Sequence, residues 1–264
     1  MRVAGTWTDT SVPIWSLPER GERGPKPRYS RAEIAAAAIR IADAEGITAV
    51  TMRRVATELG TGTMSLYNYV PAKEHLLQLM ADQTFAEYAY PPSRPPGRRA
   101  AIADLARQGR DIARRHPWLP AIMHRPPPMG PSTLRYIDYF LGLLAGTGPD
   151  TAANMETIAI INGFALMYGA MQAALDDERA RTGITEQEQQ AAPVKVLTDA
   201  AASGSYPNLA AALAAPSPPP RTADQNFDSC LVHLIDGALG RTGKLGLGGS
   251  TSRARRGRPP GPSS

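Results

Sequence analysis

The sequence predicts an all-α fold, in which an N-terminal unit of three short helices is joined by a linking helix to a larger C-terminal helical bundle. Apolar residues recur at helical spacing almost everywhere between the prolines, and no block shows the period-two alternation of strands. Proline clusters at 91–96, 125–131 and 216–220 favour loops that connect helices. A chain of 264 residues that is 42% hydrophobic is long enough to bury a core.

The first helix has clear start and stop signals. Ser30 and Glu33 form an S-x-x-E capping box, in which each residue satisfies an amide that the helix start leaves open. Gly46 is a typical residue to end the helix. One apolar face runs between these signals, through Ile34, Ala38, Ile41 and Ala42.

Residues 51–70, TMRRVATELGTGTMSLYNYV, have the pattern of a helix-turn-helix. Thr51 and Thr63 are suited to cap two short helices, and Gly60 lies at the turn between them, where a positive φ is needed. Ala56 supplies a small side chain at the crossing. Three apolar residues should hold the two helices together: Val55, Leu59 and Leu66. A fourth helix is expected after Pro71, through Leu76, Leu77, Met80, Thr84, Phe85 and Tyr88.

The C-terminal unit is predicted to contain helices near 98–115, 132–145, 151–181, 185–202 and 224–239. The helix at 151–181 is apolar on nearly all sides in its middle, so we expect it to be buried all round. Small residues along it would let another helix approach closely: Gly163, Gly169, Ala170 and Ala173.

Composition and charge exclude several classes of protein. The single Cys230 cannot form an internal disulfide, the four histidines lack metal-ligand spacing, and there is no P-loop or strand-linked G-x-G-x-x-G. We therefore expect no metal, no cofactor and no enzymatic activity. The N-terminus has no apolar export signal, and no run reaches the ~18 apolar residues of a membrane span, so a cytoplasmic protein without a membrane partner is expected.

Basic residues are concentrated at the two ends of the chain. Residues 1–30 carry a charge of +2 and residues 241–264 carry +6, which leaves −3 of the total +5 for 31–240. Such asymmetry hints at nucleic acid, although solvated disordered ends explain it equally well. Lys26 and Arg28 precede the first helix, and the sequence RGRP at 256–259 is similar to an AT-hook core.

Residues 30–77, from SRAEIAAAAIRIADAEG to TMRRVATELGTGTMSLYNYVPAKEHLL, resemble the DNA-binding region of the tetracycline-repressor (TetR) family. Residues 115–170 resemble, more weakly, the ligand-binding and dimerisation domain of that family. The resemblance implies a homodimeric transcriptional repressor. Two recognition helices would enter successive major grooves, about 34–36 Å apart, of a palindromic double-stranded operator. An unidentified small-molecule effector would release the DNA.

The resemblance also implies the domain boundaries and the residues that contact DNA. It implies an N-terminal basic arm at 1–27, a DNA-binding domain at 28–90, an effector and dimerisation domain at 98–240, and a basic tail at 241–264, with both ends disordered. The implied DNA contacts are Thr51, Met52, Arg53, Thr63, Met64, Ser65, Tyr67, Asn68, Tyr69 and Lys73. Four of these residues also have a structural explanation. Thr51 could cap the helix, Met64 and Tyr67 could serve packing only, and Arg53 could be a solvated charge.

Aromatic, methionine and polar residues of the C-terminal unit suit a mostly apolar effector cavity, and each is also explained by core packing. They are Trp118, Met123, His124, Tyr136, Phe140, Met155, Asn162, Phe164, Met167, Tyr168 and Met171. No motif matches the ligands of tetracycline and its magnesium ion, so tetracycline itself is not implied.

Three alternatives stay open at this stage. Cys230 and His233 are spaced i, i+3 on a helix and could form a nucleophile pair in a helical enzyme, although no third group accompanies them. The basic ends fit a non-specific architectural DNA-binding protein. An activator would use the same DNA-binding domain as a repressor.

Overall fold

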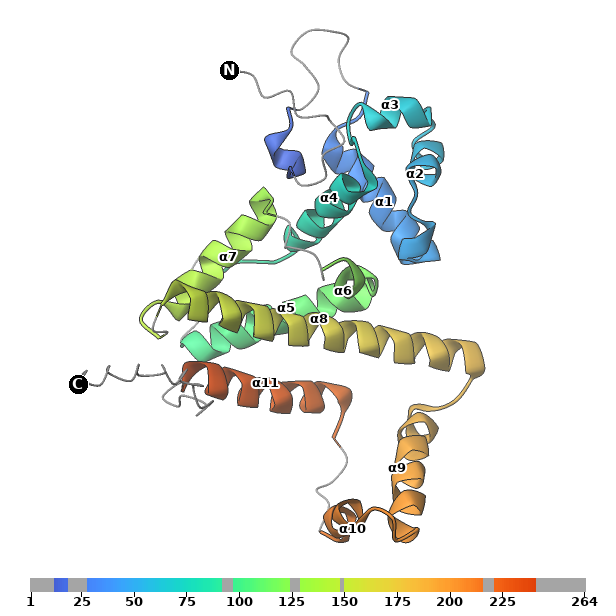
Figure 1. Ribbon diagram of the computed structural model, residues 1–264, viewed down its shortest axis with the longest axis vertical. Coiled ribbons are helices and arrows are strands. Elements are labelled where there is room, and N and C mark those ends of the chain that lie inside the picture. The colour runs from blue at the N-terminus through green and yellow to red at the C-terminus, as the bar shows by residue number, and fades with distance from the viewer. Residues whose placement is uncertain are drawn as a thin grey trace, which may run out of the picture.

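The computed structural model describes residues 12–18, 28–91, 97–123, 129–147, 150–215 and 221–240, and every regular element in these ranges is a helix (Figure 1). The predicted all-α fold is therefore confirmed. The elements are η1 (Ile14–Ser16), α1 (Arg31–Glu45), η2 (Ile47–Ala49), α2 (Met52–Glu58), α3 (Thr63–Tyr67), α4 (Lys73–Phe85), α5 (Arg98–Arg115), α6 (Leu119–Ile122), α7 (Pro131–Leu144), α8 (Thr151–Thr182), α9 (Glu186–Ala202), α10 (Pro207–Ala214) and α11 (Ala223–Leu239).

Local signals set the ends of α1 as the sequence predicts. The Ser30 hydroxyl accepts from the Glu33 amide at 3.2 Å, and the Glu33 carboxylate accepts from the Ser30 amide at 2.7 Å. Hydrogen bonds from Ser30 lower the pKa of Glu33. Gly46 ends the helix with a φ of 83°, a conformation that favours glycine.

Residues 12–18 were expected to belong to a disordered arm, and the structure corrects this. They form η1 and lie against α1 and α4, with the Ile14 side chain fully buried. The Ile14 amide donates to the Gln78 side chain at 3.0 Å. We call residues 12–18 the strap. The Arg31 guanidinium donates to three of its carbonyls, those of Ile14, Leu17 and Pro18. One buried apolar side chain and these hydrogen bonds explain why residues 12–18 pack against the helices.

Replacing Ile14 with valine is expected to lower the free energy of unfolding by about 0.5–1.5 kcal/mol, because one buried methylene is lost. Urea unfolding followed by circular dichroism measures the change. Ile184→Val is the matched control, since Ile184 lies outside the helices and is only partly buried, so its effect should be smaller. An unchanged stability for Ile14→Val would show that the strap does not dock.

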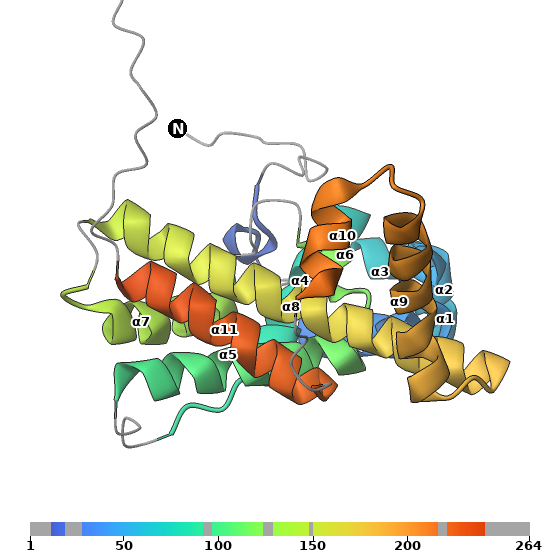
Figure 2. The ribbon, with the colours of Figure 1, turned by 90° about the horizontal axis from the view of Figure 1, so that it is seen from below.

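The C-terminal unit is built around the contact between α5 and α8, and α11 packs on both helices (Figure 2). Gly169 of α8 makes the close approach possible. A Cβ at this position would lie 2.2 Å from the carbonyl oxygen of Arg110 and 2.9 Å from Cβ of Ala113. Glycine therefore sets how near the two longest helices of the bundle come to each other.

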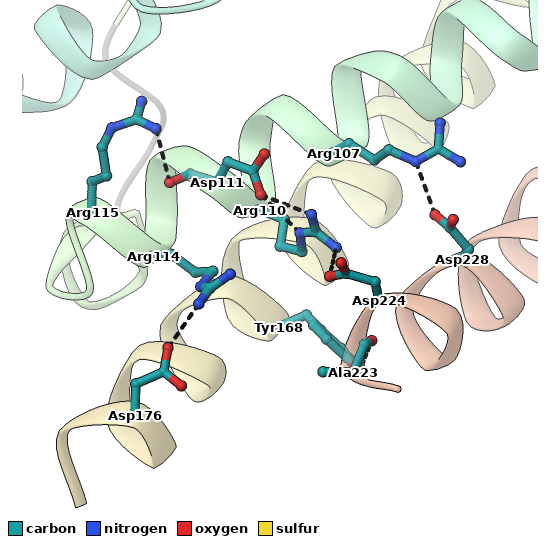
Figure 3. A network of polar contacts seen from close by, with 10 residues as sticks. All are labelled: Arg107, Arg110, Asp111, Arg114, Arg115, Tyr168, Asp176, Ala223, Asp224 and Asp228. Carbon is teal, nitrogen blue, oxygen red and sulfur yellow. Dashed lines mark hydrogen bonds and ion pairs between the residues drawn. The ribbon is translucent and has the colours of Figure 1, made fainter. Parts of the chain in front are cut away.

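Ion pairs also join α5 to its two neighbours (Figure 3). Exposed pairs of this kind contribute little stability each. Arg110 differs, because its side chain is buried and its guanidinium also lies 4.7 Å from the ring centroid of Phe227. The pairs are Arg107 with Asp228 at 2.9 Å, Arg110 with Asp224 at 2.9 Å, and Arg114 with Asp176 at 2.8 Å.

The expectation that the helix at 151–181 is buried all round was wrong. The most apolar 18-residue window of α8 has a mean hydropathy of 1.5, and only 33% of that window is buried. By length and composition α8 could therefore cross a membrane, whereas the sequence analysis expected no such segment. One side packs on α5, and the other exposes apolar side chains. These are Ile160, Met167, Met171 and Leu175.

Two α-helices of the described residues, α6 and α10, were not expected from the sequence, and neither were the 3-10 helices η1 and η2. Helices α9 and α10 pack on each other and project from the bundle beyond the end of α8 (Figure 1). Neither α9 nor α10 contains a buried residue.

Candidate nucleic-acid interface and effector cavity

The helix-turn-helix predicted for residues 51–70 is present as α2, a short turn and α3. Gly60 has a φ of 62° in that turn. The side chains of Val55, Ala56 and Leu66 are buried where the two helices pack together. The Thr51 hydroxyl accepts from the Arg54 amide at 3.1 Å and so caps α2. Thr63 is the first residue of α3 rather than its cap, which is Gly62.

The side of α3 opposite Leu66 faces solvent. Met64 has 78% and Tyr67 has 40% of its surface exposed, and Ser65 and Asn68 are exposed as well. Figure 1 places α3 at the end of the N-terminal unit farthest from α8. A short helix with exposed hydrogen-bonding side chains at the tip of the molecule can enter a groove of duplex DNA.

The other sequence-predicted contacts are distributed around this face. Thr51 and Arg53 are exposed at the start of α2, and Thr63, Tyr69 and Lys73 are partly exposed. Met52 was predicted to contact DNA, but only 6% of its surface is exposed and it packs in the core. An apolar side chain at the first helical position can point inward, which the resemblance alone did not show.

Arg54 is held within the protein although it neighbours the predicted contacts. Its guanidinium is 2.7 Å from Glu45 and 3.0 Å from Glu58. Hydrogen bonds to Glu45 and then to Glu58 raise the pKa of Arg54. Arg53, which points to solvent, is therefore the better placed cation of α2.

An apolar cavity of about 220 Å³ lies between α4 of the N-terminal unit and α7 and α8 of the C-terminal unit. Four of the predicted residues line it. The other lining residues were not predicted, because helical periodicity does not show which faces of α4, α7 and α8 turn toward one another. The lining residues are Phe85, Met123, Thr133, Tyr136, Ile137, Met155, Ile158, Ala159, Asn162, Gly163 and Leu166.

The side chains of Asn162, Thr133 and Tyr136 are the polar members of the lining, and Asn162 connects to two tyrosines. Its Oδ1 accepts from the hydroxyl of Tyr88 at 3.2 Å and from that of Tyr136 at 3.5 Å. Burial raises the pKa of both tyrosines, so they stay protonated as donors. The cavity can therefore take a mostly apolar molecule and orient it by few hydrogen bonds.

Several residues predicted for the cavity have other places. Trp118 is buried and donates to Asp43, Phe140 is fully buried in the core, and Met167 and Met171 are exposed on α8. Phe164 and Tyr168 pack against Phe227 of α11. Tyr168 also donates to the Ala223 carbonyl at 2.9 Å (Figure 3). His124 lies outside the described residues. Tertiary packing, which the helical pattern does not reveal, separates these groups.

The described part of the chain contains no group of three or more histidine, cysteine, aspartate or glutamate side chains that could hold a metal ion. Cys230 is a free, exposed cysteine on α11, and Nδ1 of His233 is 2.7 Å from the Ser229 carbonyl oxygen. The ring is thus engaged by its own helix.

Two family descriptions match the chain. Residues 34–80 match the tetR family of bacterial regulatory proteins, and residues 92–241 match the tetracyclin repressor-like C-terminal domain. The chain belongs to the TetR family. This TetR-family protein is a DNA-binding transcriptional regulator, with the fold and the DNA partner that the sequence resemblance implied.

Relatives and solved structures agree with this assignment. The HTH-type transcriptional repressor DrrR1 of Streptomyces coeruleorubidus is 39% identical over 198 residues, which cover 75% of this chain and 73% of that protein. The TetR family protein ActR of Streptomyces coelicolor, in complex with actinorhodin, superposes with a TM-score of 0.65 at 26% identity, over 81% and 97% of the two chains. BioQ with its double-stranded DNA operator, at 18% identity and a TM-score of 0.51 over 81% and 99%, shows the shared fold.

Proposed function

We propose that this TetR-family regulator is a repressor that a small molecule releases from a palindromic operator, acting in the cytoplasm and without catalytic activity. The exposed face of α3 is the single observation that carries the proposal, because it offers base-reading side chains at the tip of the molecule. We assign DNA binding to 28–90 and effector binding with dimerisation to 98–240.

The proposed DNA contacts are the predicted residues whose side chains are exposed or partly exposed, which leaves out Met52. Thr51 and Arg53 approach the phosphates from the start of α2, and Lys73 approaches them from the start of α4. Asn68 suits bidentate pairing with adenine. The remaining contacts are proposed along α3 and just after it, from Thr63, Met64, Ser65, Tyr67 and Tyr69.

The dimer interface is proposed on α8 and α11. Helix α5 leaves apolar side chains of α8 exposed, among them Met167 and Met171. The neighbouring α11 exposes Val232. Two such helices from each of two subunits would form a four-helix interface and remove these side chains from water. The uncovered apolar surface of α8 thus fits contact with a second subunit, and a membrane is not needed to explain it.

The cavity is proposed as the effector site because it reaches α4. Phe85 of α4 lines it, and so does Thr133 of α7. The Thr133 amide and hydroxyl each donate to Asp82 of α4 at 2.8 Å, in a buried contact. A molecule that moves α7 would therefore move α4, which follows α3 in the DNA-binding unit. DrrR1 is named a repressor and ActR is seen with actinorhodin, which supports this mode of action.

Selecting bound sequences from a random duplex pool with the full chain tests the proposal. We expect a palindrome with half-sites about 10 base pairs apart, bound at least ~10³-fold more tightly than random DNA. Sedimentation at micromolar concentration should show a dimer. A pool without a consensus would indicate non-specific architectural binding and would refute the proposal, as would a monomer that binds a single half-site.

A further inference from the structure

His116 lies where the N-terminal unit meets the bundle, one residue beyond the end of α5, and 8% of its surface is exposed. Its Nδ1 is 2.8 Å from Oδ1 of Asp43 on α1. Its Nε2 is 2.9 Å from Oε1 of Glu87, two residues beyond α4. The ring therefore bridges two carboxylates of the unit that carries α3.

The hydrogen bonds of this cluster require a charged ring. An ionised carboxylate only accepts hydrogen bonds, and a neutral imidazole donates through one nitrogen. Only the imidazolium form of His116 satisfies both Asp43 and Glu87 at once. A neutral ring would turn a lone pair toward one of the carboxylates and release that contact.

The surroundings favour the charged form. Burial opposes the charge, but the hydrogen bonds to Glu87 and Asp43 outweigh it and raise the pKa of His116 above 6.5. The charged groups that the ion pairs bring to the ring are Asp43 from α1, Glu87 after α4, and Arg115 of α5, which is 2.5 Å from Glu87. Burial raises the pKa of Glu87, but hydrogen bonds to His116 and Arg115 outweigh this and lower it.

We propose that His116 is a positioning residue for operator binding, which in its imidazolium form fixes the DNA-binding unit on the bundle through Asp43 and Glu87. The proposal rests on the proposed function and adds the contact that sets the orientation of α3. Two copies of α3 must fit a fixed half-site spacing, so a unit that moves freely spends less time in the competent orientation, and affinity falls by that fraction.

A second hydrogen bond to the Asp43 carboxylate provides the control. Nε1 of Trp118 donates to Oδ1 of Asp43 at 2.6 Å, and the indole does not titrate. Trp118→Phe removes a hydrogen bond from the same junction but leaves the titrating ring. A merely structural role for the cluster would make the two variants alike, whereas a charge-dependent role separates them by pH.

The test measures binding of the selected duplex by fluorescence anisotropy from pH 6 to pH 9 at fixed salt. Wild-type affinity should fall about five- to tenfold as pH rises from 6.5 through the pKa of His116. His116→Gln should lack this fall and should equal the wild type only at high pH. Trp118→Phe should keep it, as should His233→Gln, which alters an exposed histidine on α11. A wild-type pH profile in His116→Gln would overturn the proposal.

A second measurement keeps the two proposals separable. If the pool yields no preferred duplex, the proposed function fails. The contact of His116 with Asp43 and Glu87, which we call the clamp, is then tested on the protein without DNA. NMR titration should then show a pKa of His116 above 6.5 that falls in Glu87→Gln, and amide exchange in α1 and α4 should be faster in His116→Gln than in His233→Gln. An ordinary His116 pKa, or equal exchange in the two variants, would refute the clamp. If His116→Gln does not fold, Glu87→Gln replaces it in both measurements.

Discussion

Replacing Gly169 with alanine is expected to lower the free energy of unfolding, because overpacking a core usually costs about 1–3 kcal/mol. The new Cβ would lie 2.2 Å from the carbonyl oxygen of Arg110, in the middle of α5. A backbone atom inside a helix cannot turn aside as a flexible side chain does, so α5 and α8 must separate. This loss opposes the gain of about 1 kcal/mol that alanine brings over glycine in a helix. Urea unfolding at one fixed protein concentration measures the sum.

Gly163 on the same helix is the matched control. A Cβ there meets nothing within 4 Å, so only the helix propensity of alanine acts. Gly163→Ala should therefore raise the free energy of unfolding by up to about 1 kcal/mol. Opposite signs from two identical substitutions on one helix would locate the close approach at Gly169. The same sign for both would contradict the packing described here.

Local chemistry explains why much of the fold is predictable from the sequence. The caps at Ser30 and Thr51 and the glycines at 46 and 60 act over a few residues, and the helices they delimit begin and end within one or two residues of expectation. The face of α3 was predictable for the same reason, because Leu66 is the buried residue of this short helix and Thr63, Ser65 and Tyr67 carry hydroxyls.

Contacts between distant segments explain what the sequence did not predict. The strap at 12–18 is ordered by Arg31 and Gln78, which are remote along the chain. Phe85 of the N-terminal unit lines the cavity. Trp118 was predicted to line it but donates to Asp43 at the domain junction instead. Helical periodicity identifies an apolar face but not its neighbour, so residues such as Phe164 were placed in the cavity when they pack on α11 instead.

Asn68 and Lys73 are expected to affect DNA binding in different ways. Asn68→Ala should lower the preference for the selected operator by about 1–3 kcal/mol of discrimination, because the exposed amide at the end of α3 is the group suited to read an adenine edge. Lys73→Ala should weaken operator and random duplex alike, because a cation at the start of α4 contacts phosphates, which every sequence presents. Equilibrium binding of both duplexes at several salt concentrations separates the two effects.

The salt dependence provides the sharper distinction between these two residues. Each phosphate contact releases condensed counterions, so Lys73→Ala should reduce the slope of log affinity against log salt by about one, whereas Asn68→Ala should leave it unchanged. Arg54→Ala is the matched control, because its guanidinium is engaged by Glu45 and Glu58, so its loss should change stability more than the salt slope. Equal losses on both duplexes for Asn68→Ala, or an unchanged slope for Lys73→Ala, would remove those residues from the roles assigned to them. If Arg54→Ala lowered the slope as Lys73→Ala should, Arg54 would contact a phosphate in the complex in place of Glu45 and Glu58.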